Sequence, residues 1–198
     1  MQINKTSTET IVESLHLLAT DLILNKAISV NDSLFSIIDL EVYYWHDLHQ
    51  DDYATGVPHL KPFGEFEAHR YGIDLSLGNQ LDLEFGGILI CGLRDVNSKK
   101  VYQKSEVKNI LFNQFNLGKN RFELINHKTS WSSTFKSQRM NLGIAESDNQ
   151  KQFEKSYYKF LAKDNAIFKG YKNKETIFRN SDLTDEEIKE MLGYKLKR

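Results

Sequence analysis

A glutamate and a tyrosine two residues apart, Glu41 and Tyr43, have types and spacing that could support catalysis. They lie in residues 34–45, a stretch rich in β-branched and aromatic residues that predicts a strand. Alternate side chains of a strand point to the same face, so the carboxylate and the ring lie together. Such a pair can stack a flat ring and activate a water molecule beside it. Alternatively, Tyr43 packs in the core and Glu41 pairs with a lysine or an arginine.

The segment after this strand is rich in histidine and aspartate. His46 and His49, together with Asp51 or Asp52, could ligate a hard or borderline metal ion and so form a metal-dependent hydrolase. The same residue types also order loops by bonding to backbone groups, and no HExxH signature is present. We therefore expect no metal site, and the metal-dependent hydrolase remains an alternative.

A third candidate group is the sequence HRYG at residues 69–72. A tyrosine followed by glycine can project from a turn, so Tyr71 could act as a wedge in a nucleic-acid duplex, with Arg70 on a phosphate. Alternatively, Tyr71 covers the core and Arg70 pairs with a nearby acid. Two adjacent glycines, Gly86 and Gly87, interrupt the next apolar stretch and predict a bulge or the close approach of another backbone.

Hydrophobic periodicity predicts which elements position these residues. Three helices are expected, the first starting at Thr8 or Thr10 and the last after the capping box at Thr184. Four strands are expected as well. This order predicts an α+β protein of one domain, residues 1–198, with a curved, mainly antiparallel sheet (an open barrel or roll) flanked by helices. The expected helices cover residues 8–24, 105–115 and 185–192, and the strands 34–45, 66–77, 83–93 and 157–162.

Composition and charge indicate where the protein is located and which partners it could bind. The first residues lack an apolar signal region, no apolar run could cross a bilayer, and there is one cysteine, so we expect a cytoplasmic protein without membrane contact and, by default, a monomer. Residues 1–98 hold 5 Lys/Arg against 15 Asp/Glu, whereas residues 99–198 hold 21 against 12. The second half of the chain could bind a polyanion, while the first half could form an acidic pocket. Alternatively, the two halves neutralise each other in space.

Taken in order, several short segments resemble the 3-methyladenine (alkyladenine) DNA glycosylase family. The similarity spans residues 34–165 and implies that family's fold. The segments are IIDLEVY at 37–43, YGIDL at 71–75, GILICGL at 87–93, SEVKNIL at 105–111, SQRMNLGI at 137–144 and YKF at 158–160.

The resemblance implies a DNA-repair reaction on double-stranded DNA, in which an alkylated or deaminated purine is flipped out and excised by water without a cofactor. It implies that Glu41 activates the water and that Tyr43 stacks on the extruded base. Tyr71 would wedge into the duplex, and His46 or His49 would pack on the other face of the base.

One departure concerns an arginine that the family carries at the end of its glycine-hydrophobic strand, where this chain has Cys91. That arginine helps to hold the water and the phosphate, so Arg70 or Arg94 would have to compensate. Asp52 and His69 are further candidates for positioning water or phosphate. The departure also leaves open an alternative function, a non-catalytic protein on the same scaffold that binds nucleic acid or a nucleotide.

Overall fold

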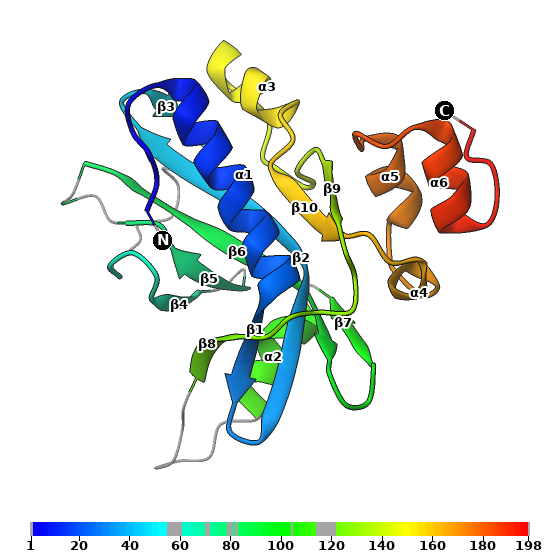
Figure 1. Cartoon of the computed structure of the whole chain (residues 1–198). Helices are drawn as coiled ribbons and strands as arrows, with labels where there is room; N and C mark the ends of the chain where they lie inside the picture. Colours follow the sequence, from blue (N-terminus) through cyan, green and yellow to red (C-terminus); the bar gives the residue numbers. More distant parts are fainter. Residues whose placement is uncertain are drawn as a thin grey trace.

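A strand of 14 residues, β2 (Ser33–His46), runs through the middle of a curled antiparallel sheet (Figure 1). The computed structural model describes residues 2–54, 61–69, 72–78, 81, 83–103, 105–113 and 122–197. One edge of β2 pairs with β6 (Phe85–Asp95). Its other edge meets three shorter strands in turn, namely β1 (Lys26–Val30), β10 (Lys159–Ala162) and β3 (His49–Gln50). The predicted strand at residues 34–45 is confirmed.

The remaining strands extend the sheet on both sides of β2. The order along its main path is β4-β5-β6-β2-β1-β8, while β7 pairs with β6 and β9 pairs with β10. These strands are β4 (Phe66–His69), β5 (Gly72–Ser76), β7 (Val101–Gln103), β8 (Phe122–Asn126) and β9 (Thr134–Ser137). All of these pairings between described strands are antiparallel. The expected α+β domain with a curved, mainly antiparallel sheet and flanking helices is confirmed.

Helix α1 (Thr8–Asn25) covers one face of the sheet (Figure 1). Its apolar residues recur every three or four positions, so they form one stripe that joins the hydrophobic core under β2. The helix predicted at residues 8–24 is confirmed, and it starts at Thr8, one of the two expected starts. Ser7 is the N-cap, and its side chain and that of Thr10 each accept a hydrogen bond from the other residue's backbone N–H.

Two predicted elements differ in extent. The segment expected as one strand at 66–77 forms the two strands β4 and β5, which pair antiparallel with His69 in register with Gly72. Helix α2 (Ser105–Asn113) matches the start of the helix expected at 105–115, whose last two residues lie outside the described residues.

Four helices follow in the C-terminal part of the chain. They are α3 (Asp148–Glu154), α4 (Asn165–Phe168), α5 (Lys174–Arg179) and α6 (Asp185–Leu192). In Figure 1 the last three stand together beside the end of β10. Phe178 of α5 joins this group to the sheet, with its ring centroid 5.3 Å from that of Phe135 on β9. The predicted capping box at Thr184 is confirmed.

None of the helices in the described parts of the chain has the length and apolar character that a membrane crossing requires.

Gly86 of β6 lets two strands approach closely at Tyr43 and Tyr44. Its φ is +150°, and a Cβ there would lie 2.1 Å from the carbonyl oxygen of Tyr43 and 2.8 Å from the Cα of Tyr44. Both of these atoms belong to the β2 backbone and cannot move aside as a flexible side chain would. The expected close approach of another backbone is therefore confirmed at Gly86.

We predict that Gly86→Ala lowers the free energy of unfolding by about 2–4 kcal/mol, since it combines a disfavoured φ with a backbone clash. Gly170→Ala is the matched control, because a Cβ at Gly170 would meet no described atom within 4 Å and its φ is not positive. It should change stability by less than about 1 kcal/mol. Urea denaturation of both variants measures this difference, and equal stabilities would contradict the close packing.

Candidate active site

Four paired strands place three polar side chains and a leucine in one row across the sheet. In register, Asp74 of β5 lies opposite Leu89, Leu89 opposite Glu41, and Glu41 opposite Lys159 of β10. Residues in register share a face of the sheet, so this row brings two acids and a lysine from distant segments to one surface.

The alternation along β2 separates this polar face from the core. Ile38, Leu40 and Val42 are buried in the hydrophobic cluster that includes α1. The alternate residues Asp39, Glu41 and Tyr43 line a cavity of about 440 Å³. Ligand pockets in proteins are commonly about 300–1,000 Å³. The predicted common face of Glu41 and Tyr43 is therefore confirmed, and this face opens onto a cavity.

Lys159 holds two carboxylates together at the floor of this cavity. Its ammonium nitrogen lies 2.6 Å from Oδ1 of Asp39 and 3.1 Å from Oε1 of Glu41. The other oxygen of each acid accepts a hydrogen bond from a tyrosine hydroxyl, from Tyr171 to Asp39 at 2.6 Å and from Tyr43 to Glu41 at 2.9 Å. The relative exposure of Glu41 is 5% and that of Lys159 is 4%. Of the alternatives for Glu41, the pairing with a lysine is therefore observed.

These contacts set the protonation states. Burial by itself would raise the pKa of Glu41, but the charge of Lys159 and the hydrogen bond from Tyr43 together lower it. For Asp39, burial dominates over the attraction of Lys159 and raises the pKa. Burial by itself would lower the pKa of Lys159, yet the two carboxylates outweigh it and raise that pKa well above its usual range. At neutral pH Glu41 is an anion and Lys159 a cation.

Arg139 packs against Tyr43 and Tyr53, whose rings form an aromatic wall of the cavity. Its guanidinium makes two hydrogen bonds to Asp51, at 2.6 and 3.1 Å, and a third to the carbonyl oxygen of Val42 at 3.1 Å. It also lies 4.6 Å from the ring centroid of Tyr43 and 5.4 Å from that of Tyr53. One face of Tyr43 is thus occupied by a buried cation, which fixes the ring through a cation–π contact.

The two histidines expected to stack on a base lie outside the cavity lining. His49 is 3% exposed and sits in the core, where Nδ1 contacts the carbonyl oxygen of Tyr44 at 2.8 Å and Nε2 contacts the hydroxyl of Tyr158 at 2.6 Å. A carbonyl only accepts, so Nδ1 carries the proton and Nε2 accepts from Tyr158. Burial lowers the pKa of His49 and keeps the ring neutral. His46 stacks parallel to Tyr44 instead.

The candidate metal ligands of the same segment have separate protein partners. Asp51 is bound by Arg139, His49 by backbone and Tyr158, and Asp52 accepts a hydrogen bond from the hydroxyl of Ser147 at 3.4 Å. Within the described residues, no three histidine, cysteine, aspartate or glutamate side chains gather where they could hold a metal ion. The metal-dependent hydrolase expected as an alternative therefore lacks a ligand set among these residues.

The candidates for positioning water or phosphate divide into three groups. His69 lines the cavity, with Nε2 3.2 Å from Oδ1 of Asp74. Arg94 is outside the lining and pairs with Asp164 at 3.1 Å. Arg70 and the expected wedge Tyr71 lie outside the described residues. Asp52 is also outside the lining.

Sequence reasoning missed three residues at the floor of the cavity. Asp39 could have been found, because it lies two residues before Glu41 and therefore shares its face. Asp74 and Lys159 become neighbours of Glu41 only through the strand register. The wall residue Tyr171 comes from the Lys-rich C-terminal segment, which carries no local signal.

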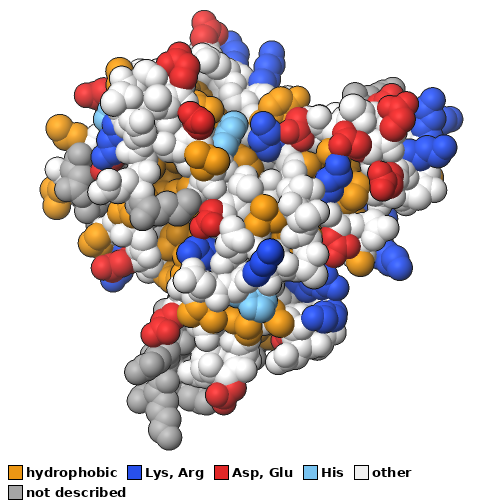
Figure 2. Space-filling model, in the orientation of Figure 1, with side chains coloured by type: hydrophobic (Ala, Val, Ile, Leu, Met, Phe, Trp, Pro, Cys, Tyr) orange, Lys and Arg blue, Asp and Glu red, His pale blue; other side chains and the backbone are white. Residues whose placement is uncertain are grey.

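The charge asymmetry of the two halves is partly cancelled inside the protein. Lys159 and Arg139 of the second half pair with Asp39, Glu41 and Asp51 of the first. Figure 2 shows acidic and basic side chains interspersed on the surface of the C-terminal helices at the right. The second of the two alternatives, neutralisation in space, thus holds for these buried charges.

Comparison with protein-family models, curated proteins and solved structures found no match to this chain.

We predict that Lys159→Met lowers the free energy of unfolding by about 3–5 kcal/mol, because it leaves Asp39 and Glu41 buried without a counter-charge. The matched control is Lys163→Met, whose ion pair with Glu187 lies near the surface and contributes less than about 1 kcal/mol. Adding Asp39→Asn and Glu41→Gln to Lys159→Met should restore most of the loss. Chemical denaturation measures all three variants, and equal effects of the two lysine substitutions would contradict the bridging role.

Proposed function

We propose that this protein is a monofunctional DNA N-glycosylase that removes an alkylated or deaminated purine flipped out of a DNA duplex. The observation that carries the proposal is the carboxylate of Glu41 at the floor of a cavity, paired with Lys159 and beside the ring of Tyr43. The resemblance of the segments around these two residues to the alkyladenine DNA glycosylases supports it further.

The chemistry suits a carboxylate in this position. As the bond from C1′ to the base nitrogen breaks, its electron pair leaves with the base and the sugar gains oxocarbenium character. Glu41 stabilises that positive charge and takes a proton from the water whose oxygen bonds to C1′. Both carboxylate oxygens already accept one hydrogen bond, from Lys159 and Tyr43, and each keeps a lone pair for water.

The cavity also suits a flat base. Three tyrosines, Tyr43, Tyr53 and Tyr171, contribute to its lining, and aromatic stacking stabilises an extruded base by about 1–3 kcal/mol per contact. A base inside a duplex cannot reach a carboxylate at the floor of a cavity, so flipping is required, and it costs least for damaged or mispaired bases. The proposed partner is therefore double-stranded DNA, with no cofactor required for this reaction.

Two observations favour a second candidate, a protein on the same scaffold that binds a nucleotide or nucleic acid without cleaving it. Lys159 neutralises much of the charge of Glu41, and Cys91 stands where the family's arginine would hold the water. Lesion-selective binding without release of a base would favour this candidate over the glycosylase.

We predict that Glu41→Gln slows base release at least about 100-fold, the usual contribution of a general base. The assay measures free base from duplexes carrying hypoxanthine, ethenoadenine or 3-methyladenine. Asp39 keeps its pairing with Lys159 in this variant, so the fold should persist. The control is Glu190→Gln, an exposed acid on α6 outside the cavity lining, which should release base at the wild-type rate. Equal rates for wild type and Glu41→Gln would exclude the proposed catalytic role.

We also predict that the reaction leaves an abasic site in an intact strand. A lysine attacks C1′ only as a neutral amine, and the raised pKa of Lys159 keeps it charged. Borohydride added during the reaction should therefore trap no covalent protein–DNA adduct, and strand scission should require alkali. A trapped adduct that disappears in Lys159→Arg would show that Lys159 is a nucleophile.

A further inference from the structure

One wall of the cavity is built by a segment that lies beyond the glycosylase-like part of the chain. Tyr171, Lys172 and Asn173, in the segment that connects α4 to α5, line the cavity together with the sheet residues. The resemblance to the alkyladenine DNA glycosylases ends near residue 165, so it implies nothing for this wall. Because residues of this segment line the cavity, the C-terminal part of the chain belongs to the candidate site.

The connecting segment is held in place at successive residues. Tyr171 donates its hydroxyl to Asp39 at the cavity floor at 2.6 Å. The next backbone N–H, that of Lys172, donates to the side-chain oxygen of Gln103 on β7 at 2.9 Å. Asn173 then turns the chain with a left-handed φ of 55° and opens α5 by accepting from the N–H of Ile177. The backbone of Lys172 is thus fixed on both sides at the cavity.

Its side chain is an exposed cation on the cavity lining. Within the part of the chain that the structure describes, the ammonium group of Lys172 makes no ion pair or hydrogen bond. The cavity interior is different, because its lysine, Lys159, is fully engaged by two acids. Lys169 and Lys174 lie within three residues of Lys172 and add positive charge to this segment.

The site therefore combines an acidic floor with a cationic outer wall. Asp39, Glu41 and Asp74 outnumber the single ammonium group of Lys159 among the buried lining residues. Such a gradient fits a ligand whose inner part is neutral or cationic and whose outer part is an anion. A nucleotide has this distribution, since the base is neutral or, when alkylated, cationic, and the phosphate is anionic.

We propose that Lys172 binds a phosphate group of the nucleotide whose base occupies the cavity. The inference rests on the proposed function, since it assumes that the cavity takes a base, but it concerns binding and not bond cleavage. Lysine binds phosphate as a point charge, and the fixed backbone of this segment limits where that charge can be.

The test measures binding in the Glu41→Gln background, so that substrate is not consumed. The probes are 2′-deoxyinosine, 2′-deoxyinosine 3′,5′-bisphosphate and a duplex with one hypoxanthine. Lys172→Ala should weaken binding of the bisphosphate about tenfold and leave the nucleoside unchanged, as expected for a charged hydrogen bond. For the duplex, the slope of log affinity against log salt should decrease in magnitude by about 1. Lys172→Arg should restore both quantities.

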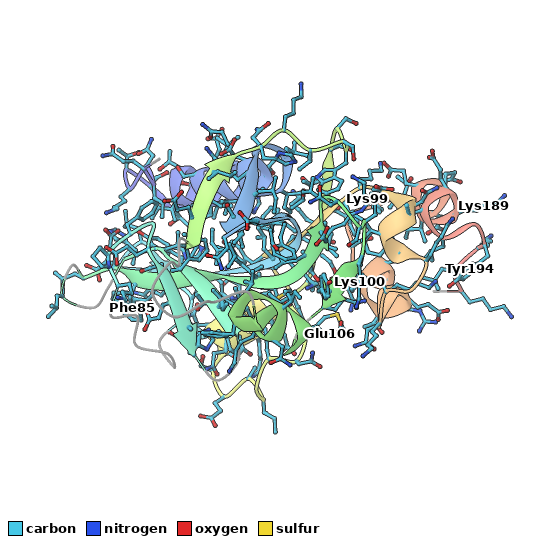
Figure 3. All side chains as sticks on the ribbon, turned by 90° about the horizontal axis from the view of Figure 1, so that it is seen from below. Phe85, Lys99, Lys100, Glu106, Lys189 and Tyr194 are labelled. Atoms are coloured by element: carbon cyan, nitrogen blue, oxygen red, sulfur yellow. The ribbon has the colours of Figure 1, made fainter. Side chains whose placement is uncertain are left out.

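Lys189→Ala is the matched control. Lys189 is also an exposed lysine of the C-terminal helices, but Figure 3 shows it at the outer end of this group, away from the sheet. This variant should bind all three probes as its Glu41→Gln parent does.

The inference is overturned if Lys172→Ala binds the bisphosphate and the duplex as its parent does, if Lys189→Ala has the same effect, or if the parent does not prefer the bisphosphate to the nucleoside. The proposed function fails on a different result, the absence of base release by the wild type. A phosphate preference that depends on Lys172 without base release would keep this inference and leave the non-catalytic binding protein as the function.

Discussion

The ammonium group of Lys159 between Asp39 and Glu41 is the interaction on which the rest of the site depends. Two carboxylates on adjacent same-face positions of a central strand would be costly to bury without a counter-charge. Lys159 supplies that charge from β10, so the pairing of β10 with β2 brings in the cation that helps to lower the pKa of Glu41. Through Asp39 the same cluster reaches Tyr171, which brings the C-terminal segment against the sheet.

A second buried cation has a separate role. Arg139 binds Asp51 and the carbonyl oxygen of Val42 and lies against the ring of Tyr43, so it connects the segment after β2 to the back of the aromatic wall. Lys159 sets the charge at the cavity floor, whereas Arg139 sets the position of the ring. If these acidic and aromatic side chains were mobile, they would have to be ordered whenever a ligand bound. The contacts with Lys159 and Arg139 order them in the free protein.

Local patterns predicted the long elements well. Helix α1 carries clear periodicity, strand β2 is a long run rich in β-branched and aromatic residues, and α6 begins at a capping box, so each is specified by residues within a few positions of one another. Several strands of three to five residues were not predicted, because they are stabilised by pairing with distant segments rather than by their own composition. The short helices α4 and α5 likewise depend on packing of Phe168 and Phe178 against Phe135.

The candidate site, like the fold, has some features that the local sequence specifies and others that depend on distant segments. The sequence by itself determined that Glu41 and Tyr43 share one face, since the period of two is a property of any strand. It could not determine which group would neutralise Glu41, because Lys159 is 118 residues away and reaches it only through strand register. Nor could it determine which histidine would face the cavity. His46 and His49 were the candidates by position, and the tertiary structure buries His49, whose neutral ring donates to the carbonyl oxygen of Tyr44 and accepts from the hydroxyl of Tyr158.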